Sequence, residues 1–183
     1  MLIHTQRLRL ITCEMQHLEA IVRDPRTLGD LLKVSIPDQW PGYPDAYPHA
    51  LSLLKKQPQR SFSGWWLYLF VNPAAKALVG CGGFKDAPDS EGVVEIGCEV
   101  APAFRRQGYA TEALLGLARF AFTRPQVGAV DACSLPVKGA QSRLLQAIGM
   151  TRIGEGRGDD ADRVWHWRLT RERFLKSAAT VKR

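Results

Sequence analysis

EIGCEVAPAFRRQGYATEALLGLARFAF, residues 95–122, begins as a strand, passes two arginines and a glycine, and ends as a helix. Apolar residues after Gly108 recur at the i, i+3, i+4, i+7 spacing of an amphipathic helix, which predicts a helix over 108–123. Gly108 permits a tight turn and the close approach of a ligand to the backbone. The first turn of a helix offers unpartnered N–H groups and partial positive charge. With Arg105 and Arg106 beside it, this junction is predicted to bind an anion, and two linked phosphates suit it better than one carboxylate.

The elements around this junction indicate a mixed sheet. Strands are predicted over 5–12, 64–71, 77–84 and 93–100, the last three as an antiparallel meander, and then over 130–136, 151–156 and 163–170. Helices are predicted over 14–33, with a break at Asp24-Pro25, and over 47–56 and 140–148. The fold class is therefore α/β (α+β), a single domain with a mostly antiparallel sheet of six to seven strands flanked by helices. Ligands in such sheets bind at the carboxyl ends of parallel strands, where the junction lies.

One loop, residues 34–48, is rich in proline and aromatic residues. Its four prolines exclude regular structure, and its aromatic side chains are too apolar for an idle linker. The loop either covers a site or plugs the edge of the core, and both interpretations stay open.

Composition limits the classes of partner. The 183 residues are 45% hydrophobic and 23% charged, as in ordinary soluble domains, and no long apolar run or signal peptide is present, so a cytoplasmic location without membrane contact is predicted. The net charge is +7, but residues 171–183 hold five basic and one acidic side chain, which predicts a frayed basic terminus and argues against nucleic acid. The four cysteines have no metal-ligand spacing, so we expect reduced, mostly buried thiols and no metal.

Neither a Walker loop nor a dinucleotide fingerprint occurs in the chain. The pattern V-x-P-x-x-R-R-x-G-Y-A-T-E-A at residues 100–113 instead resembles the acetyl-coenzyme A motif of the GNAT N-acetyltransferases. Further similarity lies in R-L-x-L at residues 7–10, in E-I-G at residues 95–97, and in Ala140, Ser142, Gly149 and Met150. These positions resemble the branch that acetylates ribosomal-protein N-termini. The resemblance implies a GNAT domain over 1–174 followed by a basic tail over 175–183.

The resemblance also implies a cofactor site for acetyl-CoA or coenzyme A. Backbone amides of the junction would hold the pyrophosphate, namely Arg105, Arg106, Gln107, Gly108, Tyr109 and Ala110. The strand before it would pair with the pantetheine arm through Cys98, Glu99 and Val100, and splaying between strands 93–100 and 130–136 would admit the arm. Gly139 and Ser142 would lie along the arm. Two positions depart from the family pattern, because Gly139 stands where asparagine is usual and Leu145 where many relatives carry a proton-donating tyrosine.

Acetyl transfer to an amine needs a base, an oxyanion donor and a proton for the thiolate. Glu95 and Glu99 lie on the same face of one strand, so either carboxylate could be the base. Glu95 is preferred because it belongs to E-I-G, although Glu99 is closer to the expected thioester; the other is a solvated or ion-paired glutamate. A strand amide near Glu99 or Val100 is the expected oxyanion donor. Ser142 either donates to the sulfur or bonds to the backbone of its own helix start.

The four histidines show no catalytic or metal spacing and receive no role. Trp165 and Trp167 are expected to pack in the core or an interface, although one of them could line the acceptor pocket. The predicted function is acetyl transfer from acetyl-CoA to a primary amine by direct attack in a ternary complex. The amine, on a protein N-terminus, a lysine or a small molecule, is not decided. The alternative is a CoA-binding sensor or partner-binding protein that has lost turnover, and a homodimer is also left open.

Overall fold

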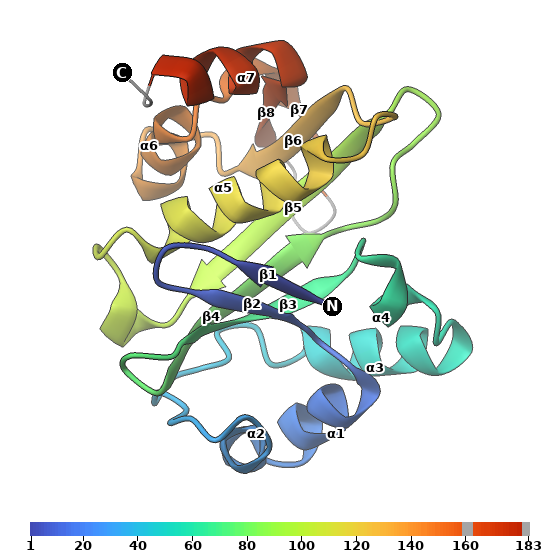
Figure 1. The fold of residues 1–183 in the computed structure, drawn as a ribbon, viewed down its shortest axis with the longest axis vertical. Helices are drawn as coiled ribbons and strands as arrows, with labels where there is room; N and C mark the ends of the chain where they lie inside the picture. Colours follow the sequence, from blue (N-terminus) through green and yellow to red (C-terminus); the bar gives the residue numbers. More distant parts are fainter. Residues whose placement is uncertain (159–162, 181–183) are drawn as a thin grey trace.

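The computed structural model describes residues 1–158 and 163–180. Within them, eight strands form one sheet in the order β1-β2-β3-β4-β5-β6-β8-β7 (Figure 1). The strands are β1 (Leu2–His4), β2 (Arg9–Thr12), β3 (Leu67–Asn72), β4 (Ala77–Phe84), β5 (Val93–Val100), β6 (Ala129–Ser134), β7 (Thr151–Gly156) and β8 (Val164–Thr170). The helices are α1 (Met15–Arg23), α2 (Pro25–Leu32), α3 (Ala46–Lys56), α4 (Arg60–Ser63), α5 (Tyr109–Phe122), α6 (Ala140–Ala147) and α7 (Arg171–Thr180), with a 3-10 turn at Pro102–Phe104.

The predicted fold class is confirmed, with one strand more than expected. The segment predicted as a single strand over 5–12 contains the turn and the second strand of a hairpin. In the turn, the N–H and hydroxyl of Thr5 donate to the Leu8 carbonyl, and the Leu8 N–H donates to the Thr5 hydroxyl. Met1 and residues 2–4 therefore lie beside β2, and β2 pairs with β3. The alternation expected within 5–12 holds, since Leu8 and Leu10 are buried and Arg9 is exposed.

Two hydrophobic clusters lie on opposite faces of the sheet. One joins Leu10, Tyr68 and Ile96 to the apolar stripe of α5, and the other joins Leu69 and Leu78 to α1, α2 and α3. Figure 1 shows α5, with α6 and α7 beyond it, on one side and α1 to α3 on the other. Because both faces of β3 to β5 are covered, burial of the strands fixes their register.

The sheet opens between β5 and β6, as predicted. These two strands are parallel but pair only from Val93 to Glu95, opposite Ala129 to Asp131. Beyond Glu95, β5 continues along β4 to Val100, whereas β6 continues along β8 to Ser134. Each strand keeps one neighbour and loses the other, so the edge of β5 is left open after Glu95.

The C-terminal segment differs from the prediction of a frayed terminus. Residues 171–180 form α7, and the guanidinium of Arg171 donates to the carbonyls of Phe122, Arg124 and Val127 at distances of 2.6–3.1 Å. Phe174 is buried against Phe122, with ring centroids 5.0 Å apart. The predicted domain boundary at residue 174 thus falls inside a helix, and residues 181–183 of the predicted tail lie outside the described part of the chain.

The loop of residues 34–48 packs two aromatic residues at the edge of the core and exposes a third beside two cavities. Trp40 and Tyr47 are buried in the core, with ring centroids 5.9 Å apart, whereas Tyr43 is 71% exposed and lines two cavities. In the described residues we find no helix with the length and apolar character needed to span a bilayer.

Candidate active site

A pocket of about 370 Å³ lies between the start of α5 and the start of α6. Gly108 precedes α5 with φ of 81°, a conformation that side-chain-bearing residues rarely adopt, and Arg106 also has a positive φ. Five of the six predicted pyrophosphate residues line the pocket, namely Arg105, Arg106, Gly108, Tyr109 and Ala110. Arg143 of α6 lines the opposite side and was not predicted. The pocket therefore combines helix N–H groups with three guanidinium groups, which is the chemistry of a diphosphate site.

The N-terminal hairpin holds this junction through Arg7. Its Nη1 donates to the carbonyl of Gln107 at 3.0 Å, its Nε donates to Glu112 at 2.7 Å, and its guanidinium lies 4.5 Å from the ring centroid of Tyr109. Glu112 also accepts from the hydroxyl of Thr5 and from the backbone N–H of Arg7. Gln107, the sixth predicted residue, is thus bound to the hairpin rather than lining the pocket.

Burial alone raises the pKa of the Glu112 carboxyl. The hydrogen bonds from Thr5 and from the backbone and side chain of Arg7 outweigh that effect, so the pKa lies below its usual value. Glu112 is therefore ionised at neutral pH and keeps Arg7 over the loop. Nothing in the local sequence of the junction indicates this contact, because the partners are about a hundred residues apart.

The side chain of Tyr109 has a structural role. It is buried, its hydroxyl accepts from Asn72 Nδ2 at 2.9 Å, and its ring packs edge-on against Phe104. Tyr109 is the first residue of α5 and lines the pocket, and the N–H groups of a first helical turn have no intrahelical partner.

The open edge of β5 presents the backbone of even-numbered residues. The backbone N–H of Lys85 donates to the carbonyl of Glu95, and the backbone N–H of Ala101 donates to the carbonyl of Val79. The odd-numbered residues of β5 therefore form the backbone hydrogen bonds with β4. The amides of Cys98 and Val100 therefore point to the open edge, where the Val100 carbonyl accepts from Arg105 Nε at 3.0 Å. The expectation that the Glu99 backbone serves the pantetheine arm is wrong, because that backbone faces β4.

The side chain of Cys98 points to the α5 face of the sheet. Burial raises the pKa of its thiol to about 12, and the charge of Glu99 contributes to the shift. The thiol is therefore neutral, and what Cys98 offers to a ligand at the open edge is its backbone.

On the opposite face, a cavity of about 560 Å³ lies between β4, β5 and α3. Its walls are mostly apolar, and both predicted base candidates, Glu95 and Glu99, line it. Glu99 Oε1 lies 3.4 Å from the N–H of Gly42, 3.5 Å from the Tyr47 hydroxyl and 3.5 Å from Cys81 Sγ. Burial, with the nearby Cys81 and Glu99, raises the pKa of Tyr47, so this tyrosine is a neutral donor. Glu99 is thus held in place by the loop and α3.

Glu95 stands where β5 and β6 begin to separate. It lines the apolar cavity and also a second cavity of about 430 Å³, whose other walls include residues of β6 and β8. There Cys133 Sγ lies 3.4 Å from His166 Nδ1, and burial together with Glu95 raises the pKa of the Cys133 thiol to about 11. Lys85 Nζ is 4.0 Å from Glu95 Oε2. Sequence reasoning gave His166 and Cys133 no role, since only the pairing of β6 with β8 brings them beside Glu95.

Ser142 is placed elsewhere. Its hydroxyl is buried, accepts from the N–H of Gly139 at 2.9 Å and donates to the Gly139 carbonyl at 3.1 Å. Of the two roles considered for Ser142, the structure shows the second, a hydroxyl that bonds to the backbone at the start of its own helix. Gly139 precedes α6 as its N-cap, and Leu145 is buried in the core. Neither Gly139 nor Ser142 lines the cavities that hold Glu95.

The two tryptophans of β8 pack as expected. Trp167 is buried and donates to Ser134 Oγ at 3.0 Å, and Trp165 donates to Glu155 at 2.9 Å. Both line a separate cavity beside α6, together with Ser142, and neither lines the cavities at Glu95.

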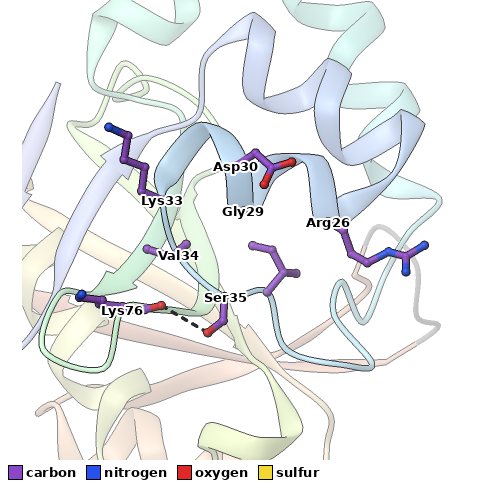
Figure 2. A pocket seen from close by; sticks show the side chains of 8 residues that line it. Arg26, Gly29, Asp30, Lys33, Val34, Ser35 and Lys76 are labelled. Atoms are coloured by element: carbon purple, nitrogen blue, oxygen red, sulfur yellow. Dashed lines mark hydrogen bonds between the residues drawn. The ribbon is translucent and has the colours of Figure 1, made fainter.

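Another pocket, of about 510 Å³, lies beside α2 and the turn between β3 and β4. Arg26, Lys33 and Lys76 line it, and Figure 2 shows the side chains of Arg26 and Lys33 pointing away from its centre. Two of the lining residues are hydrogen-bonded, since Ser35 Oγ donates to the Lys76 carbonyl at 3.3 Å (Figure 2). None of the residues that line it is a predicted site residue, and it does not include Glu95.

The sequence is similar to known acetyltransferases, both to a family and to an individual relative. The sequence matches the family described as acetyltransferase (GNAT) domain over residues 7–151. The uncharacterised N-acetyltransferase YjdG of Bacillus subtilis (strain 168) is 30% identical over 152 residues, which cover 81% of this chain and 88% of YjdG.

Solved structures share the fold at lower identity. RimL, a ribosomal L7/L12 alpha-N-protein acetyltransferase solved with coenzyme A, superposes with a TM-score of 0.68 at 16% identity, covering 93% of this chain and 98% of RimL. A spermidine N-acetyltransferase SpeG chimera from Vibrio cholerae and hSSAT superposes with a TM-score of 0.68 at 14% identity, covering 93% and 99%. Because these two enzymes are named for different acceptors, likeness of fold does not select an acceptor for this chain.

Proposed function

Because the chain belongs to the GNAT acetyltransferase family, we propose that it transfers the acetyl group of acetyl-CoA to a primary amine by direct attack in a ternary complex. The observation that carries the proposal is the continuity of the site. A diphosphate pocket at the start of α5 leads along the open edge of β5 to cavities that contain Glu95. A cytoplasmic location is part of the same proposal.

In this proposal, the pocket at Gly108 binds the pyrophosphate, with Arg105, Arg106 and Arg143 supplying charge. The backbone of Cys98 and Val100 pairs with the pantetheine arm as an added strand would. The fit is supported by the backbone of this chain, since Gly108 adopts a φ of 81° directly before α5, and Gly108, Tyr109 and Ala110 all line the pocket.

Glu95 is the proposed base. An ordinary amine is protonated at pH 7, so one proton must leave before the nitrogen attacks the thioester carbon. Glu95 accepts that proton, and the neutral nitrogen forms a bond to the thioester carbon. The carbon–sulfur bond of the tetrahedral intermediate then breaks, the sulfur leaves as coenzyme A thiolate, and the second proton lost by the nitrogen passes to the thiolate or to water. Of the two open-edge amides, that of Val100 pairs with the arm and that of Cys98 is the proposed oxyanion donor, while Cys98 meets the arm through its carbonyl. A thiolate with a pKa near 8.5 needs little help as a leaving group, which fits the occupied hydroxyl of Ser142 and the buried Leu145.

A CoA-binding sensor remains the second candidate. It is favoured by Gly139, Ser142 and Leu145, because none of the three offers a side-chain proton donor to the thiolate. Turnover separates the two candidates, since a sensor binds coenzyme A without releasing thiol from acetyl-CoA in the presence of amines.

The direct test is calorimetric titration with acetyl-CoA and with coenzyme A, followed by thiol release across amine classes. Gly108→Trp should abolish binding of both, because an added Cβ would lie 3.3 Å from Arg7 Nη2, which holds the loop, and the backbone at φ of 81° would be strained. Gly128→Trp is a matched control, since Gly128 is exposed and an added Cβ there meets nothing within 4 Å. Unchanged affinity in Gly108→Trp would reject the phosphate pocket.

A further inference from the structure

The acceptor side of the site is forked. The cavities of about 560 and 430 Å³ share Glu95, Lys85 and Tyr43 and then diverge, one under α3 and one under β6 and β8. We call them the apolar branch and the basic branch. Glu95, the proposed base, stands where the two meet.

The apolar branch suits a compact hydrocarbon group. Tyr47, Trp66 and Phe84 are each about 5% exposed and form part of its walls. Gly82 and Gly97 place bare backbone along the strands that line it. An added Cβ at Gly97 would meet nothing within 4 Å, so space is open above β5 between Glu95 and Glu99. Burying an apolar group against these walls is favourable in proportion to its area.

The basic branch suits a negatively charged or strongly accepting group. Its charged and titratable members are Lys85, Arg157, His166, Cys133 and Glu95. The thiol of Cys133 is neutral, since its pKa is raised to about 11. The side-chain amide of Gln141 adds a polar group, whereas the Ser134 hydroxyl is already bonded to Trp167 and to the Leu135 carbonyl. Glu95 offsets the charge of Lys85, which lies 4.0 Å away, and Arg157 leaves the branch with a net positive charge. This charge favours a carboxylate or a peptide carbonyl over a second ammonium group.

An α-carbon bears an amine, a side chain and a carboxyl group in three directions, and the fork offers a matching partner for each. We propose that the acceptor is the α-amine of an amino acid with an apolar side chain, either free or at the N-terminus of a peptide. The amine lies at Glu95, the side chain in the apolar branch and the carboxyl-derived group in the basic branch. This inference rests on the proposed acetyltransferase function and specifies its acceptor.

Glu99 is the one feature of the apolar branch that could instead favour a diamine. Its Oε1 is already within 3.5 Å of donors on Gly42, Tyr47 and Cys81, so that oxygen is occupied by the protein itself. A diamine therefore serves as an opposing substrate in the test.

The test measures kcat/KM by thiol release for matched pairs of amines. L-leucine and L-phenylalanine are compared with isoamylamine and phenethylamine, which carry the same side chains without a carboxylate. L-serine removes the apolar side chain, and putrescine supplies a second ammonium group. Leucine amide and leucyl-glycine separate a free amino acid from a peptide N-terminus. We expect leucine or one of its derivatives to exceed isoamylamine and serine by about tenfold or more.

Variants assign the preference to the basic branch. Arg157→Gln should lower kcat/KM for the best carboxyl-bearing acceptor by about tenfold and leave isoamylamine unchanged. Lys33→Gln, in the pocket beside α2, is the matched removal of a surface charge and should change neither.

The outcomes distinguish this inference from the proposed function. Isoamylamine or putrescine turned over as well as leucine and its derivatives would overturn the acceptor class while leaving an acetyltransferase. Binding of acetyl-CoA without thiol release from these amines or from any other amine class would overturn the proposed function, and the acceptor class with it. Thiol release with other amine classes alone would overturn only the acceptor class.

Discussion

Arg7 of the N-terminal hairpin donates through Nη1 to the carbonyl of Gln107 at 3.0 Å, and Gln107 directly precedes Gly108, the N-cap of α5. A residue at the start of the chain thus holds the loop that forms the diphosphate pocket. Glu112, on the first turn of α5, completes the contact by accepting from Arg7 Nε. The conformation of the loop, with positive φ at Arg106 and Gly108, is therefore fixed from outside the loop.

We expect Arg7→Gln to weaken coenzyme A binding by about tenfold, because the loop loses a donor and a charge that order it. Calorimetry measures the affinity, and thermal unfolding measured in parallel reports the stability of the fold. Arg9→Gln is the matched control, since Arg9 is exposed on the same hairpin and its partner in the ladder is Val71. Arg7→Lys should recover less than half of the loss in binding free energy, because an ammonium group cannot donate to Gln107 and Glu112 with the fixed geometry of a guanidinium. Equal coenzyme affinity in wild type and Arg7→Gln would contradict the role of the hairpin.

Glu95→Gln should lower kcat by about a hundredfold or more, as expected when a general base is removed, and should leave coenzyme A affinity nearly unchanged. The residual rate should rise as the pH increases, because a larger fraction of the amine is then neutral without a base. Glu99→Gln is the comparison on the same face of β5, and its carboxylate is held by Gly42 and Tyr47. We expect its main effect on KM for the amine. A larger loss of kcat in Glu99→Gln would transfer the role of base to Glu99.

Ser142→Ala distinguishes a capping residue from a catalytic one. The hydroxyl accepts from and donates to the backbone of Gly139, so its loss should destabilise the protein by about 1 kcal/mol, as for other residues at helix starts. Denaturant unfolding measures the stability, and kcat should stay within about twofold of wild type at a temperature where both proteins are folded. A large fall in kcat at unchanged stability would restore Ser142 as the proton donor.

Local patterns predicted much of the fold and of the cofactor side. The apolar stripe of α5 and the glycine before it are local features, so the strand, turn and helix around Gly108 follow from the sequence. The opening between β5 and β6 was implied by family resemblance and is present. Non-local contacts were missed, because His166 comes to line the same cavity as Glu95 only through the pairing of β8 with β6.

Two errors have identifiable causes. The segment 171–180 was interpreted from its charge alone, although Glu172 and Lys176 are spaced as an i, i+4 ion pair and are 2.6 Å apart in α7. The backbone of Glu99 was assigned to the coenzyme arm, but the side of a strand that each amide faces depends on the register with β4, which no local pattern contains.

The contact between Arg7 and Glu112 should make stability depend on pH in a defined direction. The pKa of Glu112 is lowered in the folded protein from an ordinary value of 4.5. A carboxyl with a lowered folded pKa contributes stability that is fully present above the unfolded pKa and is lost as the pH falls through the folded pKa. The free energy of unfolding of wild type should therefore exceed that of Glu112→Gln by a constant amount above about pH 5, and the difference should shrink as the pH is lowered toward about pH 3. Denaturant titrations across this range measure the difference.

Glu172→Gln is the control, because Glu172 is an exposed partner of Lys176 and their surface ion pair contributes little to stability. A difference that stayed constant to the lowest pH would mean that Glu112 stabilises the protein by packing rather than through its charge.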